Sequence, residues 1–318
     1  MIKVGIIGCR DLPDAELLRV LINHPDVELK WVQARNVAGT RLDRLVPGIV
    51  GECDLVAVAE GSLDDVDLVY LCGTRAEVAL LLSKLAVPDD VRVIDLSGSH
   101  NLDHGEDRPW TYGLSEMQRR VLVHDARLVT MPGSAAVASL LAVMPMARNM
   151  LLNSPLELQV AVGQSMFTQD GKTLDGMTTA QWAHDQEQEV SFVLRQCQSD
   201  FSQPLTVTVT PLAERRTIAV TARFKCGLDR EKIAQLYEQY YDDHNFVFIV
   251  DRPIVTADVE NTNKCLLHLD KDDQNGYLTV HAVMDVLLKG SAGNAVHIMN
   301  LLFGLHERVG LSLKGTGC

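Results

Sequence analysis

The chain has no excess of basic residues and no long apolar run, and both absences narrow its function. Its 29 Lys and Arg residues are outnumbered by 42 Asp and Glu residues, giving a formal net charge of −13. Nucleic acids and anionic membranes are bound through basic patches, so this charge argues against both as partners. No segment reaches the ~20 apolar residues of a membrane span, and the first residues resemble a strand instead of a signal peptide. We therefore expect a cytoplasmic protein that binds small molecules.

Cysteines are few, and they are not clustered. The seven lie at positions 9, 53, 72, 197, 226, 265 and 318. Without a CxxC pair or a histidine cluster at ligand spacing, the sequence predicts no metal site and no disulfide framework. We interpret these cysteines as buried apolar side chains in a reducing compartment.

The first half of the chain alternates short apolar runs with amphipathic helical patterns. The expected strands lie at 4–7, 28–33, 55–58, 66–72, 91–96 and 127–130, and the expected helices at 14–23, 77–85 and 135–150. This alternation is typical of an α/β fold, a Rossmann-like doubly wound parallel sheet. We assign residues 1–150 to such a dinucleotide-binding domain.

The second half has longer strand patterns. Residues 156–162, 205–210 and 217–226 are strand-like, and the last two alternate apolar and polar residues as half-exposed antiparallel strands do. We assign residues 151–288 to an α+β substrate and dimerisation domain. Residues 289–318 begin with small and apolar residues at helical spacing, and we expect them to pack back on the first domain and complete it.

The turn after the first strand carries part of a dinucleotide fingerprint. Gly5 and Gly8 are present, but the turn continues with Arg10, and the acidic residues Asp11 and Asp14 lie where such turns prefer glycine. In one interpretation Gly8 lets the backbone approach a pyrophosphate, while Arg10 offsets the acidic charge. In the other, an aspartate caps the helix itself and the turn binds nothing.

Arg35 follows the second expected strand. A basic side chain at this position meets a ribose 2′-phosphate, so the cofactor we expect is NADP instead of NAD. An ordinary surface arginine is the alternative.

Several segments together resemble the N-acetyl-γ-glutamyl-phosphate reductase family, over nearly the whole chain. They are 5–8 (Gly-Ile-Ile-Gly), 15–25, 95–97 (Asp-Leu-Ser), 112–116 (Tyr-Gly-Leu-Ser-Glu), 132–133 (Pro-Gly), 289–296 (Lys-Gly-Ser-Ala-Gly-Asn-Ala-Val), 299–300 and 303–305. The resemblance implies reduction of an acyl phosphate of arginine biosynthesis by NADPH, through a thioester on cysteine, with a histidine as acid and base. It also implies a homo-oligomer formed through the second domain, and it places Ser97, Gly293 and Asn294 along the cofactor.

The departures from this family concentrate at the chemistry. Residues 131–134 are Met-Pro-Gly-Ser where the family has Asn-Pro-Gly-Cys, so Ser134 replaces the nucleophile. Residues 95–101 end in Asn101 where the family has an arginine able to clamp an anionic substrate. The family's His-Arg-His-x-Pro-Glu segment corresponds to 180–185, where an ungapped alignment places Trp182 at the catalytic histidine and leaves His184 two residues away.

Ser134 and His184 are therefore the candidate catalytic residues. Ser134 can act only if His184 serves as its base; otherwise Ser134 caps the helix that starts near residue 135, and His184 lies on an exposed helix face. We predict a divergent reductase whose activity is lost or weak. Two alternatives stay open: a non-catalytic regulatory or metabolite-binding subunit, and a surviving acyl-phosphate reductase or hydrolase with altered chemistry.

Overall fold

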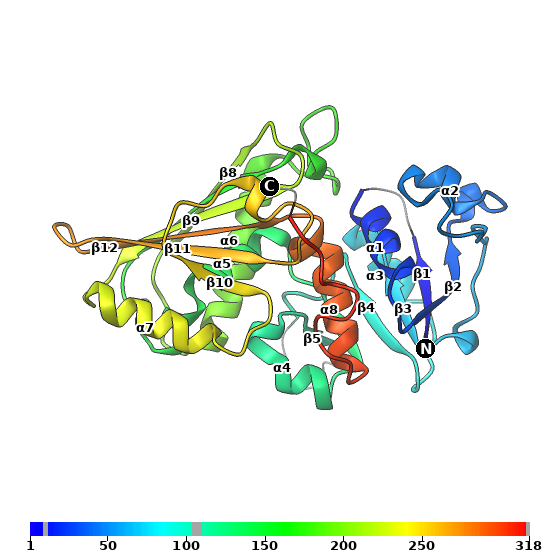
Figure 1. Cartoon of the computed structure of the whole chain (residues 1–318), viewed down its shortest axis with the longest axis horizontal. Coiled ribbons are helices and arrows are strands. Elements are labelled where there is room, and N and C mark those ends of the chain that lie inside the picture. The colour runs from blue at the N-terminus through cyan, green and yellow to red at the C-terminus, as the bar shows by residue number, and fades with distance from the viewer. Residues whose placement is uncertain (9–11, 104–109, 316–318) are drawn as a thin grey trace. The chain divides into compact units, whose positions relative to one another are not determined.

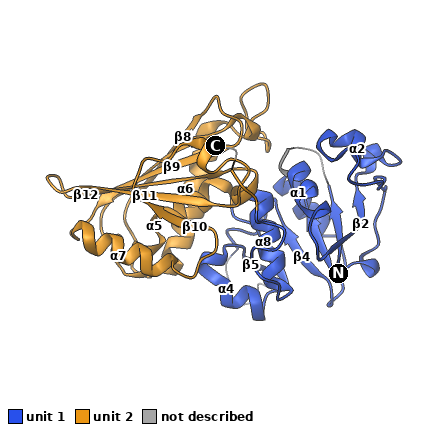
Figure 2. Ribbon diagram, viewed as in Figure 1, with its two compact units in different colours: residues 1–132, 291–312 blue, residues 133–290, 313–318 orange. Residues whose placement is uncertain are grey.

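A computed structural model describes residues 1–8, 12–103 and 110–315 (Figure 1). The chain divides into two compact units: unit 1 holds residues 1–132 and 291–312, and unit 2 holds residues 133–290 and 313–318 (Figure 2). This division places helix α5 (Ser134–Arg148) in unit 2, whereas the sequence prediction put the boundary after this helix. The helix packs on strands β9 and β12 of unit 2, which explains the placement.

Unit 1 is built on a six-stranded parallel sheet in the order β2-β1-β3-β4-β6-β5. The strands are β1 (Ile2–Ile7), β2 (Val27–Gln33), β3 (Leu68–Leu71), β4 (Arg92–Asp95), β5 (Trp110–Tyr112) and β6 (Leu128–Thr130). The side chains of β3 are all buried, as expected for a central parallel strand covered on both faces. The predicted doubly wound α/β class is confirmed.

The helices of unit 1 are α1 (Leu12–Ile22), α2 (Leu42–Leu45), α3 (Arg75–Leu82), α4 (Ser115–His124) and α8 (Gly293–Leu302). Helix α8 is buried along its whole length and packs on α1 and α4. A π-helical turn at Leu288–Ala292 precedes it, so the regular helix begins later than predicted.

The predicted strand at 55–58 is wrong. In the structure Val56 and Val58 form only isolated bridges, to Arg41 and Gln33. Val56 is 41% exposed, so this apolar run does not supply a buried sheet face.

Unit 2 contains a second six-stranded sheet, in the order β10-β11-β12-β9-β7-β8. Its strands are β7 (Leu156–Val162), β8 (Leu205–Pro211), β9 (Thr217–Lys225), β10 (Val247–Val250), β11 (Cys265–Asp272) and β12 (Tyr277–Asp285). The pairings of β9 are antiparallel, as predicted, but β8 pairs in parallel with β7 and does not neighbour β9. The sheet is thus mixed, as in an α+β domain.

Three helices form one layer on this sheet: α5, α6 (Thr179–Cys197) and α7 (Arg230–Tyr241). Helix α5 contacts both others and is buried from residue 134 to 147, as its apolar sequence on all sides requires. The hydroxyls of Tyr237 and Tyr241 donate to α5 carbonyls at 2.6 Å, which fixes α7 on α5. On the opposite face of the sheet, side chains such as Thr221 and Arg223 are only partly buried.

Candidate active site and nucleotide pocket

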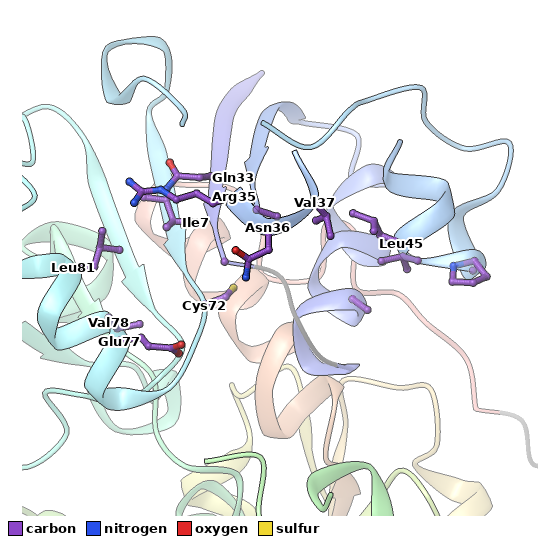
Figure 3. A pocket seen from close by; sticks show the side chains of 16 residues that line it. Ile7, Gln33, Arg35, Asn36, Val37, Leu45, Cys72, Glu77, Val78 and Leu81 are labelled. Carbon is purple, nitrogen blue, oxygen red and sulfur yellow. The ribbon is translucent and has the colours of Figure 1, made fainter. Parts of the chain in front are cut away.

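A pocket of about 950 Å³ lies at the carboxyl ends of β1, β2 and β3 in unit 1 (Figure 3). Sheets of this type bind ligands outside the carboxyl ends of their strands, where the strand order reverses, and β1 and β3 form that point here. The walls come from the ends of these strands, from α3 and from the segment 33–37 and 45–48. The position and size suit a nucleotide.

Gly8 closes strand β1 at the floor of this pocket. Its φ of +85° is in the left-handed region, and a Cβ built on it would lie 2.3 Å from the carbonyl oxygen of Cys72. Its N–H donates to the carbonyl of Gln33 at 3.0 Å. Only glycine meets both demands, and a bare backbone here lets a ligand approach closely. The predicted contact residue Arg10, and Asp11, lie outside the described residues.

Arg35 is exposed and lines the same pocket. Figure 3 shows its side chain running alongside that of Gln33. The Gln33 Oε1 accepts the N–H of Gly61 at 3.0 Å, so this amide is held in place. Residues 33–37 include no acid that would repel a 2′-phosphate or bind a 2′-hydroxyl in its place. The described pocket therefore fits NADP.

Ser97 lies in a turn organised by the buried carboxylate of Asp95. The Ser97 hydroxyl and N–H donate to Asp95 Oδ1 at 2.6 and 2.8 Å, and the Ser99 hydroxyl donates to Oδ2 at 2.7 Å. Burial would raise the pKa of Asp95, but hydrogen bonds from His100, Ser97 and Ser99 lower it below its usual value. The Ser97 hydroxyl thus already donates a hydrogen bond within this turn.

The resemblance places Asn101 at the family's arginine position, and in the structure its side chain makes hydrogen bonds in the protein interior. Its amide donates to the carbonyl of Met131 at 3.0 Å and accepts the hydroxyl of Thr130 at 2.7 Å. The side chain is 4% exposed. It cannot act as a cationic clamp.

Gly293 and Asn294 begin helix α8. The Asn294 Nδ2 donates to the carbonyl of Gly113 at 3.2 Å, while its buried Oδ1 accepts no hydrogen bond among the described residues. An unsatisfied buried acceptor is uncommon and often marks a ligand contact. Its role at the cofactor stays a prediction.

In unit 2, Ser134 is the first residue of α5. The N-cap is Gly133 and no side chain caps the helix, so the interpretation of Ser134 as a capping residue is wrong. Its buried Oγ has no hydrogen-bond partner among the described residues. A Cβ built on Gly290 would lie 3.0 Å from the Ser134 Cβ, so a bare glycine backbone packs against this side chain.

One face of α6 lies against the start of α5. Glu189 Oε1 accepts the N–H of Gly133 at 3.0 Å, and both amide atoms of Gln186 lie 3.1 Å from a Cβ built on Gly133. Trp182 is one turn before Gln186 and shares this buried face. The position that the resemblance gives to the catalytic histidine therefore faces the Ser134 region.

His184 points away from that face. Its side chain is 70% exposed, with Nδ1 3.5 Å from Glu187 and Nε2 3.1 Å from Gln188. The Ser134 Oγ makes no hydrogen bond to it. The structure does not bring the two candidate catalytic residues together, and His184 lies on an exposed helix face.

The sequence interpretation missed the carboxylate that shapes the turn before Gly290. Asp285 is fully buried, and Arg216 donates to it at 2.8 Å. It also accepts the N–H groups of Leu287 and Leu288 at 2.9 and 3.1 Å. The sequence signal that could have identified Asp285 is an acidic residue at the end of an apolar strand. The signal for Gln186 and Glu189 is their position on the apolar stripe of α6.

The sequence also predicts that the chain has no metal site and no membrane-spanning segment. Among the described residues, no group of three potential metal ligands lies together, and no helix is long and apolar enough to cross a membrane.

Comparisons with known proteins agree with the resemblance. Residues 3–124 match the semialdehyde dehydrogenase NAD-binding domain, and residues 135–285 match the semialdehyde dehydrogenase dimerisation domain. N-acetyl-gamma-glutamyl-phosphate reductases of Parabacteroides distasonis and Phocaeicola vulgatus are 37% and 35% identical to the chain, over 99% of each sequence. The chain belongs to the N-acetyl-γ-glutamyl-phosphate reductase family.

Solved structures of this superfamily share the fold. Aspartate semialdehyde dehydrogenase II of Vibrio cholerae superimposes with a TM-score of 0.71 at 14% identity, covering 96% of this chain and 98% of that one. The Candida albicans aspartate semialdehyde dehydrogenase, solved with NADP, gives 0.70 at 12% identity, covering 95% and 98%.

Proposed function

We propose that this chain is a member of the reductase family that binds NADPH and a small carbonyl metabolite but no longer reduces acyl phosphates. The observation that carries the proposal is the buried Ser134 hydroxyl, which has no hydrogen-bond partner in the part of the chain that the structure describes and so none that takes its proton there. Serine attacks a carbonyl only when a base activates it, whereas cysteine is partly thiolate at neutral pH.

The reductase reaction needs a covalent acyl group that can accept a hydride. NADPH, when bound, supplies that hydride. Residue 134 would have to attack the acyl carbon, release phosphate and hold the acyl group until the hydride arrives. An unactivated hydroxyl does not begin this sequence, and an oxyester accepts hydride poorly. Among the described residues no base is hydrogen-bonded to the Ser134 hydroxyl: His184 lies on an exposed face of α6, and Trp182 occupies the buried face.

Ligand binding, unlike catalysis, does not need an activated nucleophile. The first turn of α5 has no side-chain cap, and N–H groups at a helix N-terminus bind carbonyl and carboxylate oxygens; the Glu189 carboxylate already accepts the N–H of Gly133 there. In unit 1, Gly8 and Arg35 would hold the pyrophosphate and the 2′-phosphate of NADP. These features support a metabolite-binding or regulatory role related to arginine biosynthesis.

We further infer that the chain forms a homo-oligomer through unit 2. The support is the match of residues 135–285 to the dimerisation domain of the superfamily. An antiparallel-rich sheet with helices on one face also leaves its second face for a partner subunit.

Two measurements on the wild-type chain test the proposed function. Tryptophan fluorescence during titration with NADPH reports binding, and absorbance at the NADPH band reports acyl-phosphate-dependent oxidation. We expect saturable binding without turnover. Turnover would contradict the loss of activity, and absence of binding would contradict the cofactor assignment.

The variant Ser134→Cys asks whether the sulfur alone is missing. We expect it to restore little turnover, because Asn101 is an uncharged amide that hydrogen-bonds in the interior of unit 1, and His184 lies on an exposed face of α6. Ser139→Cys, a buried position in the same helix, is the matched control. Turnover comparable to an ordinary reductase in Ser134→Cys would contradict this reasoning.

A further inference from the structure

The buried side chain of Gln186 in α6 lies against the start of α5. Its Nε2 and Oε1 are both 3.1 Å from a Cβ built on Gly133, the N-cap of α5. The Nε2 donates to Asp185 Oδ2 at 3.2 Å. A carboxylate oxygen can only accept, so this contact orients the amide with its nitrogen toward Asp185. The Oε1, on a residue that is 1% exposed, accepts no hydrogen bond in the described part of the chain.

A second buried polar atom lies on the next residue of the same turn. Ser134 follows Gly133, and its Oγ is likewise without a hydrogen-bond partner among the residues that the structure describes. Glycines border both side chains: a Cβ on Gly133 would crowd the Gln186 amide, and one on Gly290 would lie 3.0 Å from the Ser134 Cβ. Buried polar atoms are nearly always hydrogen-bonded, so two unpartnered ones at one helix start indicate a ligand-binding site.

The chemistry of these atoms defines the ligand. An amide oxygen such as Gln186 Oε1 can only accept, so the ligand has to supply an N–H or O–H donor there. The N–H groups of the first helical turn have no partner within the helix and bind carbonyl oxygens, and the Ser134 hydroxyl can donate to the same oxygen. The N–H of Gly133 already donates to Glu189, so the ligand's carbonyl would meet the N–H groups that follow it.

We propose that the start of α5 binds a small primary carboxamide. Its carbonyl oxygen accepts from the first turn of α5 and from Ser134, and its NH2 group donates to Gln186 Oε1. A primary carboxamide carries this acceptor and this donor on one carbon atom. The inference rests on the metabolite-binding role under Proposed function, and it names the chemical class of that metabolite.

Gln186 is then the residue that determines specificity. An ester of the same shape supplies the carbonyl oxygen but no N–H, so it leaves the buried Oε1 unpaired. An ionised carboxylate supplies acceptors alone and places one of its oxygens against Oε1. We therefore expect the carboxamide to bind at least about tenfold more tightly than either analogue, as the loss of one buried hydrogen bond implies.

Isothermal titration calorimetry of the full chain with three ligands of one frame tests this. The ligands are N-acetylglutamine, the γ-methyl ester of N-acetylglutamate, and N-acetylglutamate, which differ only at the γ group. The variant Gln186→Met keeps the length of the side chain and removes its polar atoms. Gln188→Met, at an exposed position of the same helix, is the matched control. Circular dichroism confirms that each protein is folded.

A second variant, Ser134→Ala, separates the two ends of the ligand. It removes a donor to the carbonyl oxygen, which the carboxamide and the ester share. We expect it to weaken the binding of both by a similar factor and to keep the preference for the carboxamide. Together with the wild type, this variant decides the question if Gln186→Met does not fold.

We expect the wild type and Gln188→Met to prefer the carboxamide at least about tenfold, and Gln186→Met to lose this preference while its affinity for the ester is unchanged. A wild type that binds the carboxamide no more tightly than the ester would overturn the inference, as would a preference that survives in Gln186→Met. Absence of binding for all three ligands would also overturn it. The proposed function fails on a different result, which is NADPH-dependent turnover of an acyl phosphate.

Discussion

Replacing Arg35 with alanine tests the nucleotide pocket at one charge. Arg35 is exposed in the pocket and would meet the 2′-phosphate, which NADPH carries and NADH lacks. Two unit charges about 4 Å apart interact by ~1 kcal/mol in bulk water and ~4 kcal/mol at an effective dielectric constant of 20. For a side chain at a pocket mouth we take ~2 kcal/mol, about a thirtyfold loss of NADPH affinity.

The assay is fluorescence titration of wild type and Arg35→Ala with NADPH and NADH. Arg41→Ala is the matched control, because Arg41 pairs with Asp43 and Asp54 and does not line the pocket. We expect Arg35→Ala to weaken NADPH binding selectively and Arg41→Ala to leave both affinities unchanged. If Arg35→Ala shifts both cofactors equally, or neither, the assignment of Arg35 to the 2′-phosphate is refuted.

Three further predictions concern stability. Ser134→Ala should leave the melting temperature unchanged or raise it, since the Oγ makes no hydrogen bond to any described residue. Ser99→Ala should cost ~1–2 kcal/mol of stability by removing a donor to Asp95, and equal losses in the two variants would contradict this. Gly8→Ala should abolish NADPH binding and should lower the melting temperature more than Gly39→Ala does. Both glycines have positive φ, but a Cβ at Gly8 would meet a carbonyl oxygen and a Cβ at Gly39 would not, so similar melting temperatures of the two variants would contradict this reasoning. The pKa of Asp95 is lowered in the folded protein, so the ionised carboxylate stabilises the fold fully above about pH 4, and this stabilisation is lost as the pH falls. In Asp95→Asn the free energy of unfolding should therefore depend less on pH in the acidic range, and an unchanged dependence would refute this.

Much of the fold was predictable because its signals are local. Alternating apolar runs predicted the parallel sheet of unit 1, and the position of Arg35 after a strand predicted its place at the sheet edge. The solvent exposure of a segment could not be predicted from such local signals. The run at 55–58 has the composition of a strand, but Val56 remains exposed and pairs only through a single bridge.

The surroundings of Ser134 were harder to predict, because they depend on contacts distant in sequence. The hydrogen bond from Gly133 to Glu189 spans 56 residues, and the ion pair of Arg216 with Asp285 spans 69. The place of Gln186 and Glu189 on the apolar stripe of α6 indicates that they are buried, but not that they lie against the start of α5. The helix also begins one residue earlier than expected, at Ser134, so Ser134 is not the N-cap, and its hydroxyl has no hydrogen-bond partner among the residues that the structure describes.

The central claim is that residue 134 forms no acyl intermediate. Intact-protein and peptide mass spectrometry after incubation with excess acyl phosphate, with and without NADPH, measures this directly. The account predicts an unmodified Ser134 under both conditions. An acyl adduct on Ser134 that disappears when NADPH is added would contradict it.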